Sequence, residues 1–203
     1  GRAKSSAELA YNWKFGHAPV RGSAGWAAAT QVIKVADGDA ANGMAEKQHI
    51  TLTSTDGTTR RYVLTDAASD GSTTTGTVLS DSANTDTGAG TAGADEDGGI
   101  AVTLIFADVG TTQQVFLSAL KLSIEHENGH NGKILVSAVP DPAADGEQLI
   151  TLTQAEKGIE GNTAATTNIA NVSLSGLGED AVTSSTFSGG TTPQNRNALW
   201  WRE

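Results

Sequence analysis

Residues 49–64 constrain the fold more than any other part of the chain. The run 49–54 alternates apolar and polar side chains, and residues 60–64 form a second run that ends in large apolar residues. Between the two runs stands Asp56-Gly57, a dipeptide typical of tight hairpin turns. The pattern predicts an antiparallel β-hairpin with one buried face.

Further short apolar runs are separated by turn-forming residues. Glycine alone accounts for 24 of the 203 residues, which is typical of short strands joined by many turns. Strands are predicted at 30–35, 100–106, 133–139, 148–154 and 171–177, with an edge strand within 183–190. Only Val78 and Leu79 are sizeable apolar residues within 66–98, so this range is predicted to be a long surface loop with at most one short strand.

One helix is predicted, near residues 111–128. Thr111 is a candidate N-cap, and Gln114 follows at capping-box spacing. The apolar residues Val115, Ala119 and Leu122 recur at helical spacing and are expected to share a face, with Phe116, Leu120 and Ile124 beside them. The helix is expected to end near Asn128-Gly129, where glycine can adopt a left-handed conformation. The order of elements predicts an α+β, mainly β fold, in which this helix packs on an antiparallel sheet.

All four tryptophans lie near the ends of the chain, at positions 13, 26, 200 and 201. Tyr11, Trp13 and Phe15 alternate along an extended segment, which places three aromatic side chains on one face. Tryptophan is common where large apolar areas are buried at interfaces. We therefore predict an extended N-terminal arm (1–29), a β-rich module (30–190) and a C-terminal arm (191–203). The predicted assembly interface comprises Tyr11, Trp13, Phe15, Trp26, Trp200 and Trp201.

Charge and composition exclude several classes of function. The net charge of −10 disfavours binding to nucleic acid. The absence of cysteine excludes disulfides, thiol catalysis and iron–sulfur sites. The sequence has no apolar run of the roughly 18 residues that a membrane span needs.

The segment H-E-N-G-H at 126–130 matches the zinc motif H-E-x-x-H. That motif needs a helix that continues through both histidines, whereas Asn128-Gly129 and Asn131-Gly132 favour the end of a helix. Two interpretations remain, a structural turn and a zinc site at His126 and His130, and we favour the turn.

Acidic clusters are the other candidate metal ligands. They could bind Ca²⁺ through carboxylate oxygens, but none has the spacing of an EF-hand loop, and solvated turns are the favoured interpretation. The clusters are Asp37/Asp39, Asp95/Glu96/Asp97 and Asp141/Asp145/Glu147. No nucleotide-binding loop or nucleophile motif is present, so no cofactor and no enzymatic activity are predicted.

Several segments, taken in order, resemble virion structural proteins of marine tailed phages. They are I-T-L-T-S-T-D-G-T (50–58), the helix, N-G-K-I (131–134), L-I-T-L-T-Q (149–154) and G-I-E-G-N-T (158–163). The resemblance covers roughly residues 48–190, and the arms are similar to phage structural proteins more loosely. It implies a capsid, decoration or tail-fibre subunit in a virion or extracellular setting, with no catalytic residues to transfer.

The expected function is therefore structural: a subunit that assembles with copies of itself or with other virion or fibre subunits through its aromatic arms. Two alternatives remain. One is a secreted or surface adhesion module that binds glycans, with the loop 66–98 as its recognition element. The other is a zinc hydrolase.

Overall fold

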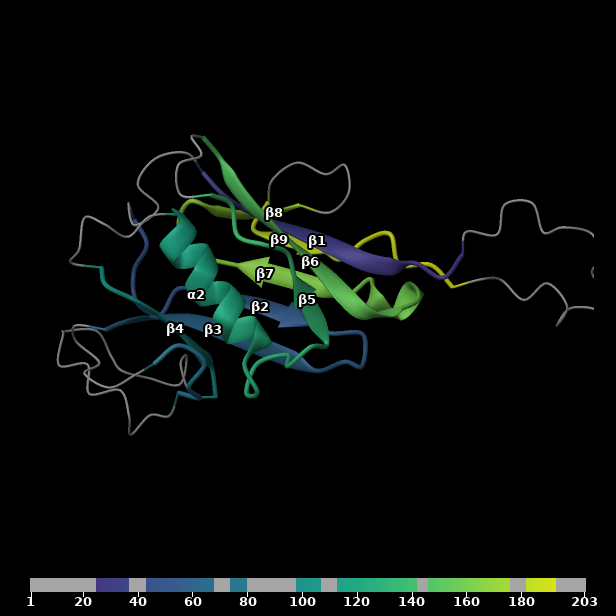
Figure 1. Cartoon of the computed structure of the whole chain (residues 1–203), viewed down its shortest axis with the longest axis horizontal. Helices are drawn as coiled ribbons and strands as arrows, with labels where there is room; N and C mark the ends of the chain where they lie inside the picture. The colour runs from purple at the N-terminus through teal and green to yellow at the C-terminus, as the bar shows by residue number, and fades with distance from the viewer. Residues whose placement is uncertain are drawn as a thin grey trace, which may run out of the picture.

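The computed structural model describes residues 25–36, 43–67, 74–79, 98–106, 113–141, 146–175 and 182–192 (Figure 1). The fold is mainly β with one α-helix, as the sequence predicts. The elements are β1 (Ala28–Val35), β2 (His49–Thr53), β3 (Thr59–Asp66), β4 (Ile100–Leu104), α2 (Gln113–Glu125), β5 (Ile134–Val136), β6 (Gln148–Lys157), η1 (Ile159–Gly161), β7 (Ala164–Thr167), β8 (Val172–Ser175) and β9 (Ser184–Thr186).

The strands form two sheets rather than the single sheet expected from the sequence. The first sheet has the order β5-β6-β1-β8, and every pair in it is antiparallel. The second has the order β4-β3-β2-β7-β9 and is antiparallel except for the pair β3 and β4, which is parallel. Ile33 from the first sheet and Ile50 from the second belong to one core cluster, so the two sheets face each other across a shared apolar interior.

The predicted hairpin is formed by β2 and β3. Its register runs from His49 opposite Val63 to Thr53 opposite Thr59. The carboxylate of Asp56 shapes the turn, because it accepts hydrogen bonds from the Ser54 hydroxyl at 2.6 Å and from the Thr58 amide at 3.0 Å.

The parallel pair β3 and β4 requires a crossover, and residues 74–79 belong to it. Val78 forms an antiparallel bridge to Ile100, and the Leu79 amide donates to the Gly99 carbonyl at 2.8 Å. Leu79 packs with Val63 and Ala101 in a second, smaller cluster. Part of the predicted surface loop 66–98 therefore covers a sheet face.

The helix α2 lies between the edge strands β4 and β5, where it closes one side of the sandwich (Figure 1). Its predicted N-cap, Thr111, lies outside the described residues. Val115 and Leu122 are 45% and 62% exposed, so these two residues do not belong to the buried face, whereas Ala119 and its predicted neighbours Phe116, Leu120 and Ile124 do. The buried apolar side chains of the helix are Phe116, Leu117, Ala119, Leu120 and Ile124.

The C-terminal part of the chain joins the two sheets on the opposite side. Val182 bridges to Leu174 in β8, β9 pairs with β7, and Ser188 bridges to Thr30 in β1. β7 was not predicted, because its Ala-Ala-Thr-Thr sequence contains no large apolar residue.

Candidate functional site

The first and last described residues of the chain lie side by side at one end of the sandwich (Figure 1). The amide and carbonyl of Ala27 exchange hydrogen bonds of 3.2 Å with those of Thr191. The Thr191 hydroxyl also donates to the Gly25 carbonyl at 2.6 Å. The N-terminal segment (residues 1–24) and the C-terminal segment (residues 193–203) therefore join the body at the same place.

A third stretch of chain, 158–161, completes this end. The Gly158 amide donates to the Ala27 carbonyl at 3.0 Å, and the Ile159 amide donates to the Thr192 hydroxyl at 3.1 Å. The backbones are so close that a Cβ at Gly190 would collide with the Gly158 carbonyl oxygen. We call residues 25–27, 158–161 and 190–192 the arm-attachment end.

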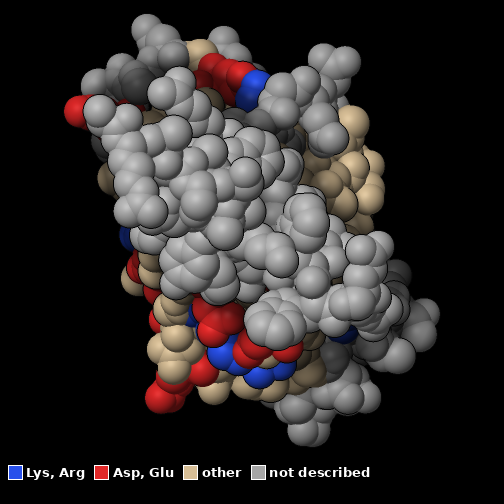
Figure 2. Space-filling view, turned by 90° about the vertical axis from the view of Figure 1, so that its right-hand side faces the viewer, with Lys and Arg blue, Asp and Glu red and all other residues tan. Residues whose placement is uncertain are grey.

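Two large apolar side chains are exposed at the arm-attachment end. Trp26 is 59% exposed and Ile159 is 61% exposed. Figure 2 looks onto this end, where acidic and basic side chains lie close together below the area drawn in grey. Exposed apolar side chains at the point where both segments attach make this end a candidate contact surface.

The structure describes only one of the six residues predicted for the assembly interface, Trp26. Tyr11, Trp13, Phe15, Trp200 and Trp201 lie outside the described residues, and their role stays a prediction. Ala29, at the predicted end of the N-terminal arm, is completely buried in the core, so the body begins inside the range 1–29. Sequence reasoning did not single out Ile159, since no periodic pattern marks an isolated apolar residue in a glycine-flanked turn.

The segment H-E-N-G-H is not helical, because α2 ends at Glu125. His126 begins the turn that follows, and its Nδ1 accepts a hydrogen bond of 3.2 Å from the Asn128 amide. A Cβ at Gly76 would lie 2.5 Å from the His126 ring, so this histidine packs directly on the segment 74–79. The continuous helix that a zinc site of this type requires is therefore not formed.

The predicted conformation of Gly129 is wrong, although the helix does end before it. Left-handed values of φ occur instead at Asn131, with φ 44°, and at Gly132, with φ 81°. Gly129 is needed for a different reason: a Cβ there would collide with the Ser123 carbonyl oxygen, which belongs to the last turn of the helix.

His130 is completely buried, with both ring nitrogens in hydrogen bonds. Nε2 lies 3.2 Å from the Thr58 carbonyl oxygen, which can only accept, so Nε2 carries the proton. Nδ1 of the neutral ring then accepts from the Tyr62 hydroxyl at 2.5 Å. Burial lowers the pKa of His130 to about 4, partly opposed by the bond to Thr58, and burial raises the pKa of Tyr62 above its usual range. The arrangement favours a neutral, structural histidine.

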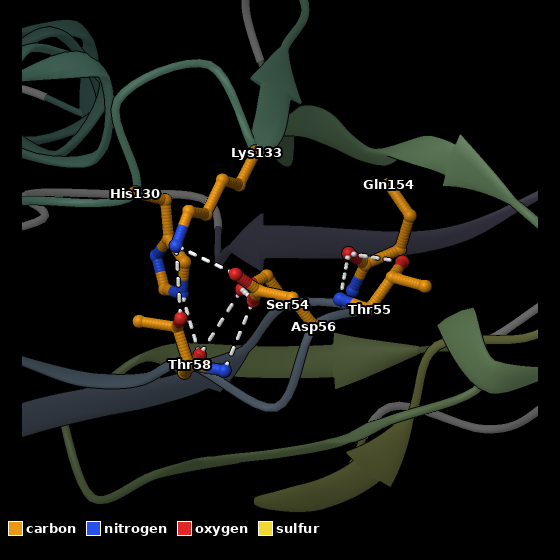
Figure 3. Close-up of polar contacts among 7 residues, drawn as sticks. All are labelled: Ser54, Thr55, Asp56, Thr58, His130, Lys133 and Gln154. Carbon is orange, nitrogen blue, oxygen red and sulfur yellow. Dashed lines mark hydrogen bonds and ion pairs between the residues drawn. The ribbon is translucent and has the colours of Figure 1, made fainter.

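An ion pair extends this network to the surface (Figure 3). Lys133 lies 2.6 Å from the Asp56 carboxylate and donates to the Thr58 hydroxyl at 2.9 Å. The pair with Lys133, followed by the hydrogen bonds from Ser54 and Thr58, holds the pKa of the Asp56 carboxyl well below its ordinary value. The hairpin turn is thus tied to the turn between α2 and β5.

Gln154 connects the two sheets in the same region (Figure 3). Its Nε2 donates to the Thr53 carbonyl at 2.9 Å and to the Thr163 hydroxyl at 3.1 Å. Its Oε1 accepts from the Thr55 amide at 2.9 Å and from the Thr55 hydroxyl at 3.1 Å. Gln154 belongs to β6, and its partners belong to the hairpin and to the residue before β7, so this side chain links the sheets.

The segments 50–58, 131–134, 149–154 and 158–163 meet in these contacts. Asp56 of the D-G-T turn binds Lys133 of N-G-K-I, and Gln154 of L-I-T-L-T-Q binds Thr163 of G-I-E-G-N-T. Polar side chains of these four segments therefore connect the two sheets.

The acidic clusters give little further support for a metal site. Within the described ranges, no group of three or more histidine or acidic side chains is close enough to hold a metal ion. Asp37, Asp39, Asp145 and residues 95–97 lie outside these ranges. Glu147 is described and forms an ion pair of 3.3 Å with Lys34.

Comparison with known proteins finds no match to a family model, to a curated protein or to a solved structure. No helix in the described part of the chain is long and apolar enough to cross a bilayer.

Proposed function

We propose that this chain is a structural protein, a self-assembling subunit of a phage or other virus particle or of an extracellular fibre. Residues 1–24 and 193–203 bind neighbouring subunits. The observation that carries this proposal is the arm-attachment end, where both segments join the body beside the exposed side chains of Trp26 and Ile159.

The described body supports this proposal because it has a hydrophobic core of its own. Its largest fully buried side chains are Tyr62, Phe116 and Phe187, all of which come from described residues. Three of the four tryptophans lie in the two segments, and Trp26 follows the N-terminal segment closely. We assign these aromatic side chains to contacts between subunits.

The geometry around H-E-N-G-H also favours a structural role for this segment. Both nitrogens of His130 hold the hairpin to the turn after the helix, and the Asp56–Lys133 pair strengthens the same junction. The likeness to virion proteins rests on residues with this joining role, which is why we place the subunit in a particle or fibre rather than among enzymes.

The test is the mass of the full-length protein, measured by light scattering over a concentration series. We expect a discrete oligomer or a growing polymer. The triple variant Tyr11→Ser, Trp13→Ser, Phe15→Ser should dissociate because the arm loses its aromatic face. Leu122→Ser, on the exposed side of α2, is the control and should assemble like the parent. A parent that is monomeric at all concentrations, or a triple variant that assembles normally, would contradict the proposal.

A further inference from the structure

The first sheet has an outer face with few charges. Strand alternation turns Ile33 and Ile150 into the core and leaves their neighbours half-buried or exposed. Among the described residues of this face two are charged: Lys34, which pairs with Glu147 at 3.3 Å, and Lys157, which lies opposite Ala28 at one end of the face. We call this surface the threonine face: Ala28, Thr30, Val32, Lys34, Leu135, Leu149, Thr151, Thr153, Ala155, Lys157 and Ser173.

The strand register places the side chains of the threonine face opposite one another. Thr30 lies opposite Thr153, and Val32 lies opposite Thr151. Leu135 and Leu149 are 52% and 44% exposed at its margins. The second sheet differs, because residues 74–79 of the same chain pack over its Val63.

In the described part of the chain, other residues already bind to both edge strands of the first sheet, β5 and β8. On β5, the Val136 carbonyl accepts a hydrogen bond of 2.9 Å from Lys121 of α2. On β8, Leu174 exchanges backbone hydrogen bonds of 2.7 and 2.9 Å with Val182. A partner of this sheet is therefore expected on its face rather than along its edges.

We infer that the threonine face is the docking surface for residues 1–24 of a neighbouring copy of this chain. This inference rests on the proposed assembly function and names the surface that receives the N-terminal segment.

Charge complementarity favours this occupant. Residues 1–24 contain four basic residues and one acidic residue, a net charge of +3. The whole chain has 13 basic and 23 acidic residues, so residues 25–203 keep nine and 22, a net charge of −13. A cationic segment is attracted to the anionic body of another copy, while Tyr11, Trp13 and Phe15 can pack among the threonine and apolar side chains of the face.

The length of the N-terminal segment is sufficient to reach a neighbouring copy. Fully extended, 24 residues span at most roughly 80 Å, which is far more than the width of one sheet. Residues 25–27 continue the chain beyond the first residue of β1, where Ala27 pairs with Thr191 (Figure 1).

The decisive experiment compares full-length variants by light scattering. Thr151→Arg places a positive charge in the middle of the threonine face and should lower the assembled fraction at least tenfold. Ser118→Arg puts the same charge on the exposed side of α2 and should assemble like the parent. Circular dichroism checks that each variant is folded, and Leu149→Arg replaces Thr151→Arg if the latter is not.

The outcomes separate this inference from the proposed function. If Thr151→Arg assembles normally while the aromatic triple variant dissociates, the segment binds elsewhere and the inference is wrong, although the proposed function stands. If both assemble normally, the arms do not mediate assembly, and both fail.

A disulfide trap tests whether the contact joins two copies. The chain has no cysteine, so Tyr11→Cys in one copy and Val32→Cys in a differently tagged copy report a single pair. We expect the yield of mixed disulfide from this pair to be at least tenfold higher than the yield from Tyr11→Cys mixed with Ser118→Cys. If a chain that carries both Tyr11→Cys and Val32→Cys forms only an internal disulfide, the segment covers its own sheet and the inference is overturned.

Discussion

The Tyr62 hydroxyl lies 2.5 Å from Nδ1 of His130, although the two residues are 68 positions apart in the chain. His130 also donates from Nε2 to the carbonyl of Thr58 at 3.2 Å. One buried imidazole therefore holds both the turn of the first hairpin and the strand that follows it. This contact fixes the turn after α2 against the second sheet.

Tyr62→Phe should reduce the free energy of unfolding by roughly 1–3 kcal/mol, because it leaves Nδ1 of a buried ring without a donor. Guanidinium denaturation measures the loss. Tyr11→Phe removes the other tyrosine hydroxyl of the chain, outside the described body, and should leave stability unchanged. Equal stability of Tyr62→Phe and the parent would show that the short contact contributes nothing.

The stability of the protein should depend on pH through His130. Its pKa is about 4 in the folded state, against 6.5 when unfolded, so the unfolded chain binds more protons between these values. Stability should therefore rise from pH 4 to pH 6.5 by up to about 3 kcal/mol and be fully present above that range.

The variant His130→Gln isolates this effect in urea titrations at a series of pH values. The difference in stability between parent and variant should grow from pH 4 to 6.5. A constant difference between parent and His130→Gln would contradict the assignment.

Local patterns predicted the strands well but not their partners. Alternation and an Asp-Gly turn were enough to predict β2 and β3, because neighbouring residues determine a hairpin. The division into two sheets depends on contacts far apart in sequence, such as β1 with β6, which no local pattern encodes. The exposed positions of Val115 and Leu122 have the same cause, since they depend on which sheet edges the helix meets.

The candidate site was predicted only in part. Trp26 was singled out from the distribution of tryptophans, and its side chain is 59% exposed, while its role in assembly stays a prediction. The pairing of Ala27 with Thr191 was not predicted, because two short stretches of small and polar residues carry no pairing signal. For H-E-N-G-H, the Asn-Gly pairs did indicate that the helix ends early, but the burial of His130 depends on Tyr62 and could not be inferred.

The glycines of the turn after α2 should differ in their tolerance of alanine. Gly129→Ala forces a Cβ against the Ser123 carbonyl oxygen and should lower the free energy of unfolding by about 3 kcal/mol or more. Gly132→Ala has open space around the new Cβ, but φ at this position is 81°, so the free energy of unfolding should fall by about 1 kcal/mol. Thermal unfolding should give a lower melting temperature for Gly129→Ala than for Gly132→Ala. The reverse result would show that the close approach of Gly129 to the Ser123 carbonyl does not control the turn.

The link between the sheets should depend on Gln154. Gln154→Leu keeps a side chain of similar size but removes the acceptor of the Thr55 amide and the donor to the Thr53 carbonyl. Unpaired polar groups of this kind cost roughly 1–3 kcal/mol, so the midpoint of guanidinium unfolding should fall clearly. Glu156→Leu, an exposed position on the same strand, should shift the midpoint little.

Hydrogen exchange gives a finer measure of the same link. The Thr55 amide should exchange faster in Gln154→Leu than in the parent, while the amides that pair β1 with β6 stay protected. If the Thr55 amide exchanges at the parent rate, another group holds the hairpin against the first sheet.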